Sequence, residues 1–280
     1  MPDASLPDLD RKTAREKYGP WAVIAGASDG TGEAFARQLA GVGVNSLLVA
    51  RRPDVLESLA ADLRSQYGVE TRILVQDLME ADAARNMLAA SADLDVGVYV
   101  SNAGADGTGS HFFEQPVERW LRLATMNVMT VTEATHGFGA RLLKRGRGGI
   151  VIMSSGAGLG GTPFLSMYSA TKSFEMVLVE ALWGELEKSE VEIVGVIAPA
   201  MDTPLVRRHV AGQGFKLGHF YAPDEVVREA LASLGRRPLI MFPADRRPPP
   251  DEVLKDRYDQ LLLSLEAGKS FFPKGQKVED

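Results

Sequence analysis

Three side chains that could move a proton or hold an oxygen atom lie close together in the second half of the chain. Ser155 precedes Tyr168 by thirteen residues, and Lys172 follows Tyr168 by four in the stretch "YSATK". Side chains four apart share one face of a helix, so the phenol and the ammonium would be neighbours there. An ammonium favours the ionised form of a phenol, whose pKa in water is about 10, and so suits it to acid–base catalysis. The alternative is an exposed helix turn that carries both groups by chance.

A glycine-rich turn follows the first apolar segment. "WAVIAG" runs into "GASDGTG", where Gly26, Gly30 and Gly32 have the spacing GxxxGxG. Such glycines allow a tight turn and a close approach of the backbone to a pyrophosphate, and a following helix offers unpaired N–H groups. An ordinary glycine-rich turn is the alternative, which its place between a first strand and a first helix disfavours.

The residues after the second apolar segment bear on the choice of dinucleotide. A carboxylate there would bind the ribose 2′-hydroxyl of NAD, whereas an arginine suits the 2′-phosphate of NADP. The segment ends in Arg51 and Arg52 without an acid, and a guanidinium binds phosphate well. Asp29 would somewhat oppose a 2′-phosphate, and a solvated helix start is the alternative. We predict NADP (NADPH) in preference to NAD.

Two later turns could also contact a nucleotide. Asp77 and Leu78 follow the segment "VETRILVQ". The carboxylate could accept from the adenine amino group or, equally, cap the next helix. In "SNAG", Asn102, Ala103 and Gly104 are small enough for the backbone to lie along a cofactor. Asn102 could also tie this loop to neighbouring strands.

The segments between these turns alternate in periodicity. Apolar runs typical of buried strands are expected at 21–26, 45–51, 69–76, 94–104, 148–155, 191–200 and 238–242, and helices at 32–43, 53–67, 80–91, 115–145, 166–188 and 223–235. Alternating strands and helices predict a parallel sheet with helices on both faces. We therefore predict an α/β fold, a doubly wound parallel sheet of Rossmann type in a single domain, with ligands beyond the carboxyl ends of the strands.

The sequence outside this alternation is short. We expect an N-terminal arm at 1–17, the domain at 18–245 with a substrate loop at 204–222, and a C-terminal helix and tail at 246–280. "RRPPPDE" is typical of a Pro-rich hinge. The segment "VLKDRYDQLLLSLEAG" after it has the pattern of an amphipathic helix that packs on the body.

Composition excludes several classes of function. The 280 residues carry a net charge of −6 and a pI near 5.4, which gives no electrostatic footprint for a nucleic acid. Cysteine is absent, so there is no disulfide or thiolate chemistry, and the four histidines lack metal-ligand spacing. We expect no metal, no signal peptide and no membrane span, and a cytoplasmic protein.

The motifs together resemble the short-chain dehydrogenase/reductase family from Trp21 to about Pro204. The matching stretches, in the family's order and spacing, are "GASDGTG", Asp77-Leu78, "SNAG", Asn127, "IVIMSSGAG", "YSATK" and "PAMDTP". The wording is most similar to the branch that holds 17β-hydroxysteroid dehydrogenases and long-chain 3-ketoacyl thioester reductases. Ala25, Thr31, Ser101 and Ala200 depart from the family's usual residues, and the methyl of Ala200 could crowd the nicotinamide end.

The resemblance implies a role for each catalytic candidate. Tyr168 would exchange a proton with the substrate oxygen, and Ser155 would hold that oxygen. Lys172 would bind the nicotinamide ribose and favour the phenolate of Tyr168. Asn127 would carry a water that links Lys172 to solvent.

The resemblance also implies a cofactor-binding set that includes the carboxamide contacts after the sixth strand. Its members would be Gly26, Ser28, Asp29, Gly30, Thr31, Gly32, Arg51, Arg52, Asp77, Leu78, Asn102, Ala103, Gly104, Tyr168, Lys172, Pro199, Ala200 and Thr203.

These expectations lead to a functional hypothesis. We predict an oxidoreductase, an NADP-dependent short-chain dehydrogenase/reductase, that transfers a hydride between NADP(H) and a ketone, steroid or 3-ketoacyl type carbonyl or secondary alcohol. The alternative is a non-catalytic dinucleotide-binding regulator of the same fold. The presence of all four catalytic candidates disfavours this alternative. The family often pairs helices corresponding to 115–145 and 166–188 between subunits, which implies a homodimer or homotetramer.

The substrate itself is expected under the loop after Pro199. Phe112, Phe164 and Met201 are candidates for the pocket lining, with core packing as the alternative for each. The cluster at 207–209, two arginines and a histidine, could meet an anionic substrate, but a solvated charge cluster is the more common arrangement.

Overall fold

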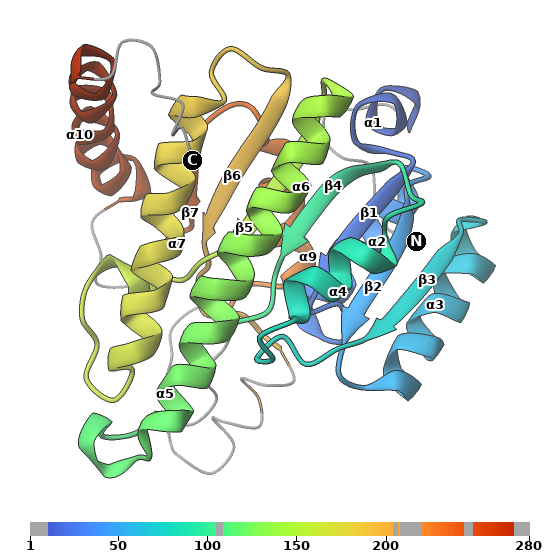
Figure 1. Ribbon diagram of the computed structural model, residues 1–280, viewed down its shortest axis with the longest axis horizontal. Coiled ribbons are helices and arrows are strands. Elements are labelled where there is room, and N and C mark those ends of the chain that lie inside the picture. Colours follow the sequence, from blue (N-terminus) through green and yellow to red (C-terminus); the bar gives the residue numbers. More distant parts are fainter. Residues whose placement is uncertain (1–10, 105–108, 204–206, 208–219, 244–248, 272–280) are drawn as a thin grey trace, which may run out of the picture.

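Seven parallel strands form one sheet (Figure 1). The computed structural model describes residues 11–104, 109–203, 207, 220–243 and 249–271. The strand order is β3-β2-β1-β4-β5-β6-β7, so the direction of winding reverses between β1 and β4. The bounds are β1 (Trp21–Ala25), β2 (Asn45–Ala50), β3 (Thr71–Val75), β4 (Val96–Ser101), β5 (Gly148–Met153), β6 (Val191–Ile197) and β7 (Leu239–Met241). The predicted doubly wound sheet is confirmed.

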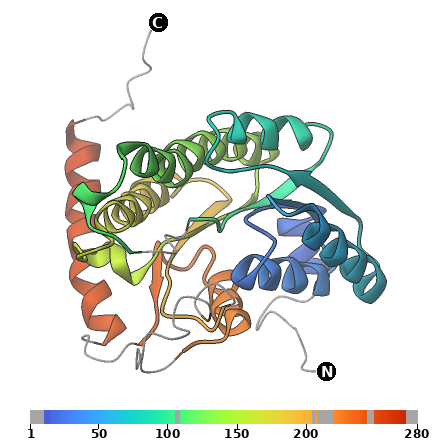
Figure 2. The ribbon, with the colours of Figure 1, turned by 90° about the horizontal axis from the view of Figure 1, so that it is seen from below.

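Helices cover both faces of the sheet, as Figure 2 shows edge-on. One face carries α1 (Arg11–Tyr18), α2 (Gly30–Gly41), α3 (Pro53–Tyr67) and α9 (Pro223–Ala232); the other carries α4 (Ala83–Ala90), α5 (Val117–Ala124), α6 (Val131–Arg145) and α7 (Ser166–Glu185). Side chains alternate along a strand, so Ile24 packs in the first layer and Val23 in the second. Both strand faces are therefore apolar, which explains the continuous apolar runs in the sequence.

The helix predicted at 115–145 is interrupted. Between α5 and α6 the chain forms a π-helical segment, η2 (Thr125–Thr130), which contains Asn127. A π turn holds an extra residue, shifts the faces of the helix around it, and often occurs at functional sites. The apolar spacing on either side still fits an α-helix, so the sequence pattern could not reveal it. The other predicted helix at 166–188 ends earlier, at Glu185.

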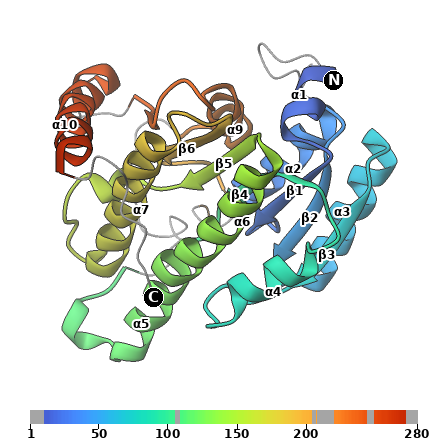
Figure 3. The same cartoon turned by 45° about the horizontal axis from the view of Figure 1, so that its top comes forward.

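The described parts of the segments outside the alternation contain one helix at each end of the chain. Ala14 and Tyr18 of α1 are buried, and the Tyr18 hydroxyl donates to Glu192 Oε2 at 2.5 Å. At the other end, α10 (Pro250–Phe271) begins inside the segment predicted as a hinge, because proline suits a first helical turn. Figure 3 shows α10 beside α7, to which it is joined by an ion pair between Arg257 and Glu180.

No described helix combines the length and apolar content that a bilayer span requires.

Candidate active site

Helix α7 places Tyr168 and Lys172 on one face. The Lys172 Nζ lies 5.8 Å from the centroid of the Tyr168 ring. The Lys172 side chain is buried and donates to the backbone oxygen of Met153 at 2.8 Å, at the end of β5. The ammonium is thus held between the helix and the sheet, with the phenol beside it. The phenol and the ammonium are therefore neighbours, as the spacing in "YSATK" predicts.

Ser155 is positioned by a short 3₁₀ helix, η3 (Gly156–Leu159), that presses against α7. The Ser155 Oγ accepts from Ala157 N at 3.2 Å at the start of η3. A Cβ at Gly158 would lie 2.7 Å from the backbone carbon of Lys172, so only glycine permits this approach. Ser154 Oγ donates to Lys172 O at 2.7 Å and ties the strand end to the helix. These contacts bring Ser155 to the helix that carries Tyr168.

Asn127 reaches the same place from the π-helical segment. Its Nδ2 donates to Thr171 Oγ1 at 2.9 Å, and that hydroxyl donates to Tyr168 O at 3.0 Å. Its Oδ1 is buried and has no hydrogen-bond partner among the described residues. A Cβ on Gly104 would lie 2.6 Å from Lys172 Nζ and 2.8 Å from Asn127 Oδ1. A buried acceptor left open beside the ammonium suits a polar ligand or a water, because buried polar groups are normally satisfied.

The glycine-rich turn lies against the end of β4. Gly26 has φ +87°, and a Cβ there would lie 2.7 Å from Ala103 N. Asn102 holds the turn from both sides: its Nδ2 donates to Gly26 O at 3.0 Å, and its Oδ1 accepts from Thr31 Oγ1 at 2.6 Å. Asn102 therefore ties the loop to its neighbours as predicted, and Thr31, a departure from the family's usual residue, supplies one of the hydrogen bonds.

The loop after β6 closes against the same turn. A Cβ on Gly30, whose φ is +54°, would lie 2.9 Å from Thr203 Cγ2. Ala200 O accepts from Tyr221 N at 3.0 Å, and Pro199 precedes it at the strand end. The backbone of this turn has conformations and close contacts that only glycine allows, and α2 begins within it. Together they form a cradle that fits a dinucleotide phosphate. The residues present thus fit a nicotinamide dinucleotide.

The two arginines after β2 differ in their surroundings. Arg52 Nη2 donates to Ser28 O at 2.7 Å and lies 3.5 Å from Asp29 Oδ2. Arg51 is exposed. The Asp29 carboxylate, which alone would repel a 2′-phosphate, therefore faces a guanidinium.

Asp77 makes contacts of its own. Its Oδ1 accepts from Met79 N at 3.0 Å, and its Oδ2 accepts from Arg122 Nη2 at 3.1 Å. Leu78 is buried, and its backbone oxygen accepts from Thr130 Oγ1 at 3.0 Å. The carboxylate thus accepts from a backbone N–H within the turn before α4, whose N-cap residue is Asp82 and not Asp77. The predicted helix cap is therefore wrong, and a contact with adenine stays a prediction.

One charged residue of the site was missed in the sequence. Both oxygens of Glu175 accept from Lys172 Nζ at 2.9 Å, three residues along α7. Burial raises the pKa of Glu175 to about 7, although Lys172 acts in the opposite direction. The available signal was a carboxylate in the otherwise apolar run "FEMVLV", on the helix face that Lys172 shares.

Two of the three residues predicted to line the substrate pocket, Phe112 and Phe164, are aromatic and contact other rings. Phe112 stacks on Trp120 with the ring centroids 5.5 Å apart, and Phe164 contacts the ring of His111 at 4.7 Å. Phe112 and Phe164 are 40% and 52% exposed, so neither is a core residue. Met201, in contrast, packs against the core, which is the alternative stated for it.

Much of the predicted substrate loop, including Arg208 and His209, lies outside the described residues. Arg207 is exposed and pairs with Asp202, with Nε 2.6 Å from Oδ1. This pair is a solvated one, as the common arrangement predicts.

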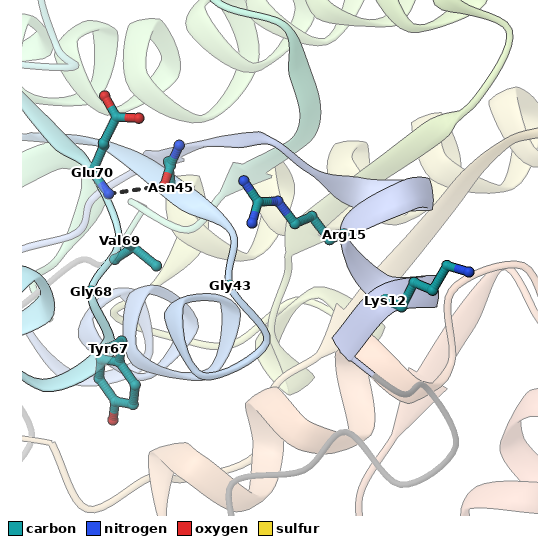
Figure 4. Close-up of a pocket in the computed structure, with 8 residues that line it drawn as sticks. All are labelled: Lys12, Arg15, Gly43, Asn45, Tyr67, Gly68, Val69 and Glu70. Atoms are coloured by element: carbon teal, nitrogen blue, oxygen red, sulfur yellow. Dashed lines mark hydrogen bonds between the residues drawn. The ribbon is translucent and has the colours of Figure 1, made fainter.

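A separate cavity of about 440 Å³ lies at the other end of the strands, where they begin (Figure 4). It is lined by Lys12, Arg15, Gly43, Asn45 and residues 67–70, at the starts of β2 and β3. Asn45 Oδ1 accepts from Glu70 N there at 2.9 Å. Ligands of such sheets bind at the carboxyl ends of the strands, so this cavity is not the candidate active site. Within the described ranges, no three His, Cys, Asp or Glu side chains gather as a metal site.

Sequence comparisons identify relatives of this chain. A family model described as short chain dehydrogenase matches residues 20–214. A 7beta-hydroxysteroid dehydrogenase from Clostridium sardiniense is 30% identical over 225 residues, which cover 80% of this chain and 85% of the relative. A very-long-chain 3-oxoacyl-CoA reductase from Laccaria bicolor is 36% identical over 233 residues, which cover 82% of this chain and 68% of the relative.

Solved structures share the fold. One from a study of 7beta-hydroxysteroid dehydrogenase stereoselectivity has a TM-score of 0.75 and 27% identity, and the match covers 90% of this chain and 99% of the other. A short-chain dehydrogenase from Sphingobium yanoikuyae in complex with NADPH has a TM-score of 0.73 and 27% identity, covering 94% and 99%. The family match contains both the glycine-rich turn and the Tyr168–Lys172 pair.

Proposed function

The chain belongs to the short-chain dehydrogenase family, and from this premise we propose that it is an NADP(H)-dependent reductase of ketone, steroid or 3-ketoacyl type substrates. The family membership makes it an oxidoreductase, which decides against the regulatory alternative. The observation that carries the finer proposal is the convergence of Tyr168, Lys172, Ser155 and Asn127 at the carboxyl end of the sheet, beside the glycine-rich turn.

The proposed mechanism follows from the side chains. When bound, the nicotinamide supplies the hydride. Tyr168 gives its hydroxyl proton to the carbonyl oxygen of the substrate, and Ser155 donates a hydrogen bond to that oxygen where negative charge develops. Lys172 stabilises the phenolate left on Tyr168. In the direction of alcohol oxidation, the phenolate takes the proton back.

The dinucleotide-binding residues divide by position. The backbone of the glycine-rich turn and of "SNAG" would hold the pyrophosphate side, and Lys172 with the loop from Pro199 to Thr203 would hold the nicotinamide side. Arg51, exposed at the end of β2, would bind the 2′-phosphate.

The substrate class is tested by turnover. The names of the two relatives specify a hydroxysteroid and a 3-oxoacyl-CoA. The exposed rings of Phe112, before α5, and Phe164, before α7, offer apolar surface. We expect NADPH oxidation, followed by absorbance, with at least one member of a panel of bulky ketones, steroids and 3-ketoacyl thioesters. The best substrate would identify the class, whereas lack of turnover with all of them would contradict the proposal.

The cofactor preference is tested at Arg51. Replacing it with aspartate, Arg51→Asp, should weaken NADPH binding about 10- to 100-fold, because a hydrogen-bonded charge pair of ~1.5–3 kcal/mol is lost. Affinity for NADH should change little. Fluorescence titration with both dinucleotides measures the two constants. The control is Arg85→Asp, the same charge change at an exposed position on α4; equal losses in the two variants would refute a specific contact.

Assembly and location are the remaining proposals. Val117 and Leu121 of α5 and Val177 of α7 are each more than half exposed, and large exposed apolar patches often mark interfaces. We propose that a second copy of the chain covers this face, in a homodimer or homotetramer in the cytoplasm. Light scattering that reports a mass near 30.2 kDa would refute the assembly.

A further inference from the structure

Helix α7 carries a carboxylate that is buried inside the active site. The side chains of Glu175 and Lys172 are 1% and 2% exposed. Both oxygens of Glu175 accept from Lys172 Nζ at 2.9 Å, and Met153 O accepts at 2.8 Å. A lysine ammonium has three protons to donate. These three acceptors use all of them.

Packing alone does not call for a carboxylate at this position. Met176 and Val179, its neighbours on α7, are fully buried in an apolar cluster. A buried ion pair is often no more stabilising than apolar side chains of similar volume. Another glutamate of α7, Glu180, differs from Glu175 in its partner. It pairs with Arg257 of α10, so that ion pair joins two helices. The partner of Glu175 lies on its own helix and within the site, which points to a role in the reaction.

We propose that Glu175 is a positioning residue, which fixes the Lys172 ammonium and offsets part of its charge beside the Tyr168 phenol. The proposal rests on the proposed function, in which Tyr168 and Lys172 act together. A carboxylate in direct contact weakens the field of an ammonium at a third group, because the two opposite charges then act as a dipole. With the Lys172 Nζ 5.8 Å from the Tyr168 ring centroid, the phenol lies within range of that change.

The pair is sensitive to protonation near neutral pH. Burial raises the pKa of Glu175 to about 7, so part of the population loses its charge in the physiological range. From β4, Tyr99 also faces Glu175, and burial raises the pKa of Tyr99, which keeps that phenol neutral. Among the described residues, Lys172 and Tyr99 are the titratable groups that interact with Glu175. Lys172 is therefore the charge through which Glu175 acts.

The first test is the pH dependence of alcohol oxidation. Glu175→Gln removes the charge and keeps the shape and one acceptor oxygen. We expect the midpoint of the kcat/KM profile to move by about one unit to lower pH, because the ammonium then favours the phenolate more strongly. Glu180→Gln, the matched change on the same helix, should leave the midpoint in place. Glu175→Asp, which restores a carboxylate, should return it towards the wild-type value.

Two outcomes of this test would overturn the proposal. One is a Glu175→Gln profile that superimposes on the wild type, and the other is a shift to higher pH. If Glu175→Gln does not fold, Glu175→Met takes its place, because it fills the same volume without a charge. The same downward shift is expected for it.

The second test needs no turnover. The family resemblance implies that Lys172 binds the cofactor ribose. When NADPH binds, Lys172 should therefore redirect hydrogen bonds from Glu175 to the ribose. The Glu175 carboxylate, which then lacks those donors, should take up protons from solvent. Calorimetric titration with NADPH at pH 7, in two buffers of different ionisation enthalpy, should show net proton uptake in the wild type and in Glu180→Gln. Uptake should be smaller in Glu175→Gln, and equal uptake in all three would refute the proposal. If no substrate turns over but this difference is seen, the proposed function fails while the role of Glu175 at Lys172 stands.

Discussion

Replacing Tyr168 with phenylalanine is expected to lower kcat by about 10²- to 10⁴-fold, the usual contribution of a positioned acid–base group. The substitution removes the hydroxyl alone. The ring stays beside Lys172, and the backbone oxygen at position 168 still accepts from Thr171. The fold should therefore be nearly unchanged, and NADPH affinity should fall far less than kcat. Steady-state kinetics with the best substrate of the panel measures kcat, and fluorescence titration measures the dissociation constant of NADPH.

The matched control for this variant is Tyr67→Phe. Tyr67 lies on α3, on the opposite face of the sheet, and is partly buried like Tyr168. It should retain wild-type kcat. Activity in Tyr168→Phe equal to that of the control would exclude Tyr168 as the proton donor. Loss of NADPH binding together with activity would instead assign Tyr168 to cofactor binding.

The arrangement of the site was predictable because the fold decides it. Runs such as "WAVIAG" and "GGIVIMSS" are apolar on both strand faces, and glycine or a polar turn ends each of them. Parallel strands bring those turns to one edge. The meeting of the glycine-rich turn, "SNAG", Ser155 and Tyr168 therefore follows from the order of elements, without knowledge of any side-chain contact.

Two features of the site escaped the sequence for different physical reasons. The π-helical segment around Asn127 adds a residue to a turn, but the apolar periodicity of α5 and α6 on either side stays helical. The residue type of Glu175 by itself predicts a solvent-exposed side chain, because carboxylates are rarely fully buried. Its burial depends on a partner, Lys172, and only the three-residue spacing hinted at that contact.

Replacing Gly32 with alanine is expected to abolish tight dinucleotide binding and to destabilise the fold by about 1–3 kcal/mol or more, the range for inserting an extra methyl group into a packed site. A Cβ at Gly32 would lie 2.0 Å from Gly26 O and 2.8 Å from Asn102 Nδ2. The first of these atoms is backbone, so the turn itself must move. The Asn102 hydrogen bond to Gly26 O would be strained by the same shift. Thermal unfolding and NADPH titration measure the two effects.

Two other glycines separate the causes of such a loss. A Cβ on Gly161 would have no atom within 4 Å, and the backbone there is not in the left-handed region that favours glycine. Gly161→Ala should therefore change neither stability nor NADPH binding. Gly68→Ala also meets nothing within 4 Å, but φ is +68°, so it should cost about 1–2 kcal/mol through backbone strain and leave NADPH affinity intact. If Gly32→Ala lowers stability yet binds NADPH like Gly68→Ala, the close approach at Gly32 serves packing alone. A loss of binding beyond its loss of stability would identify the turn as the phosphate cradle.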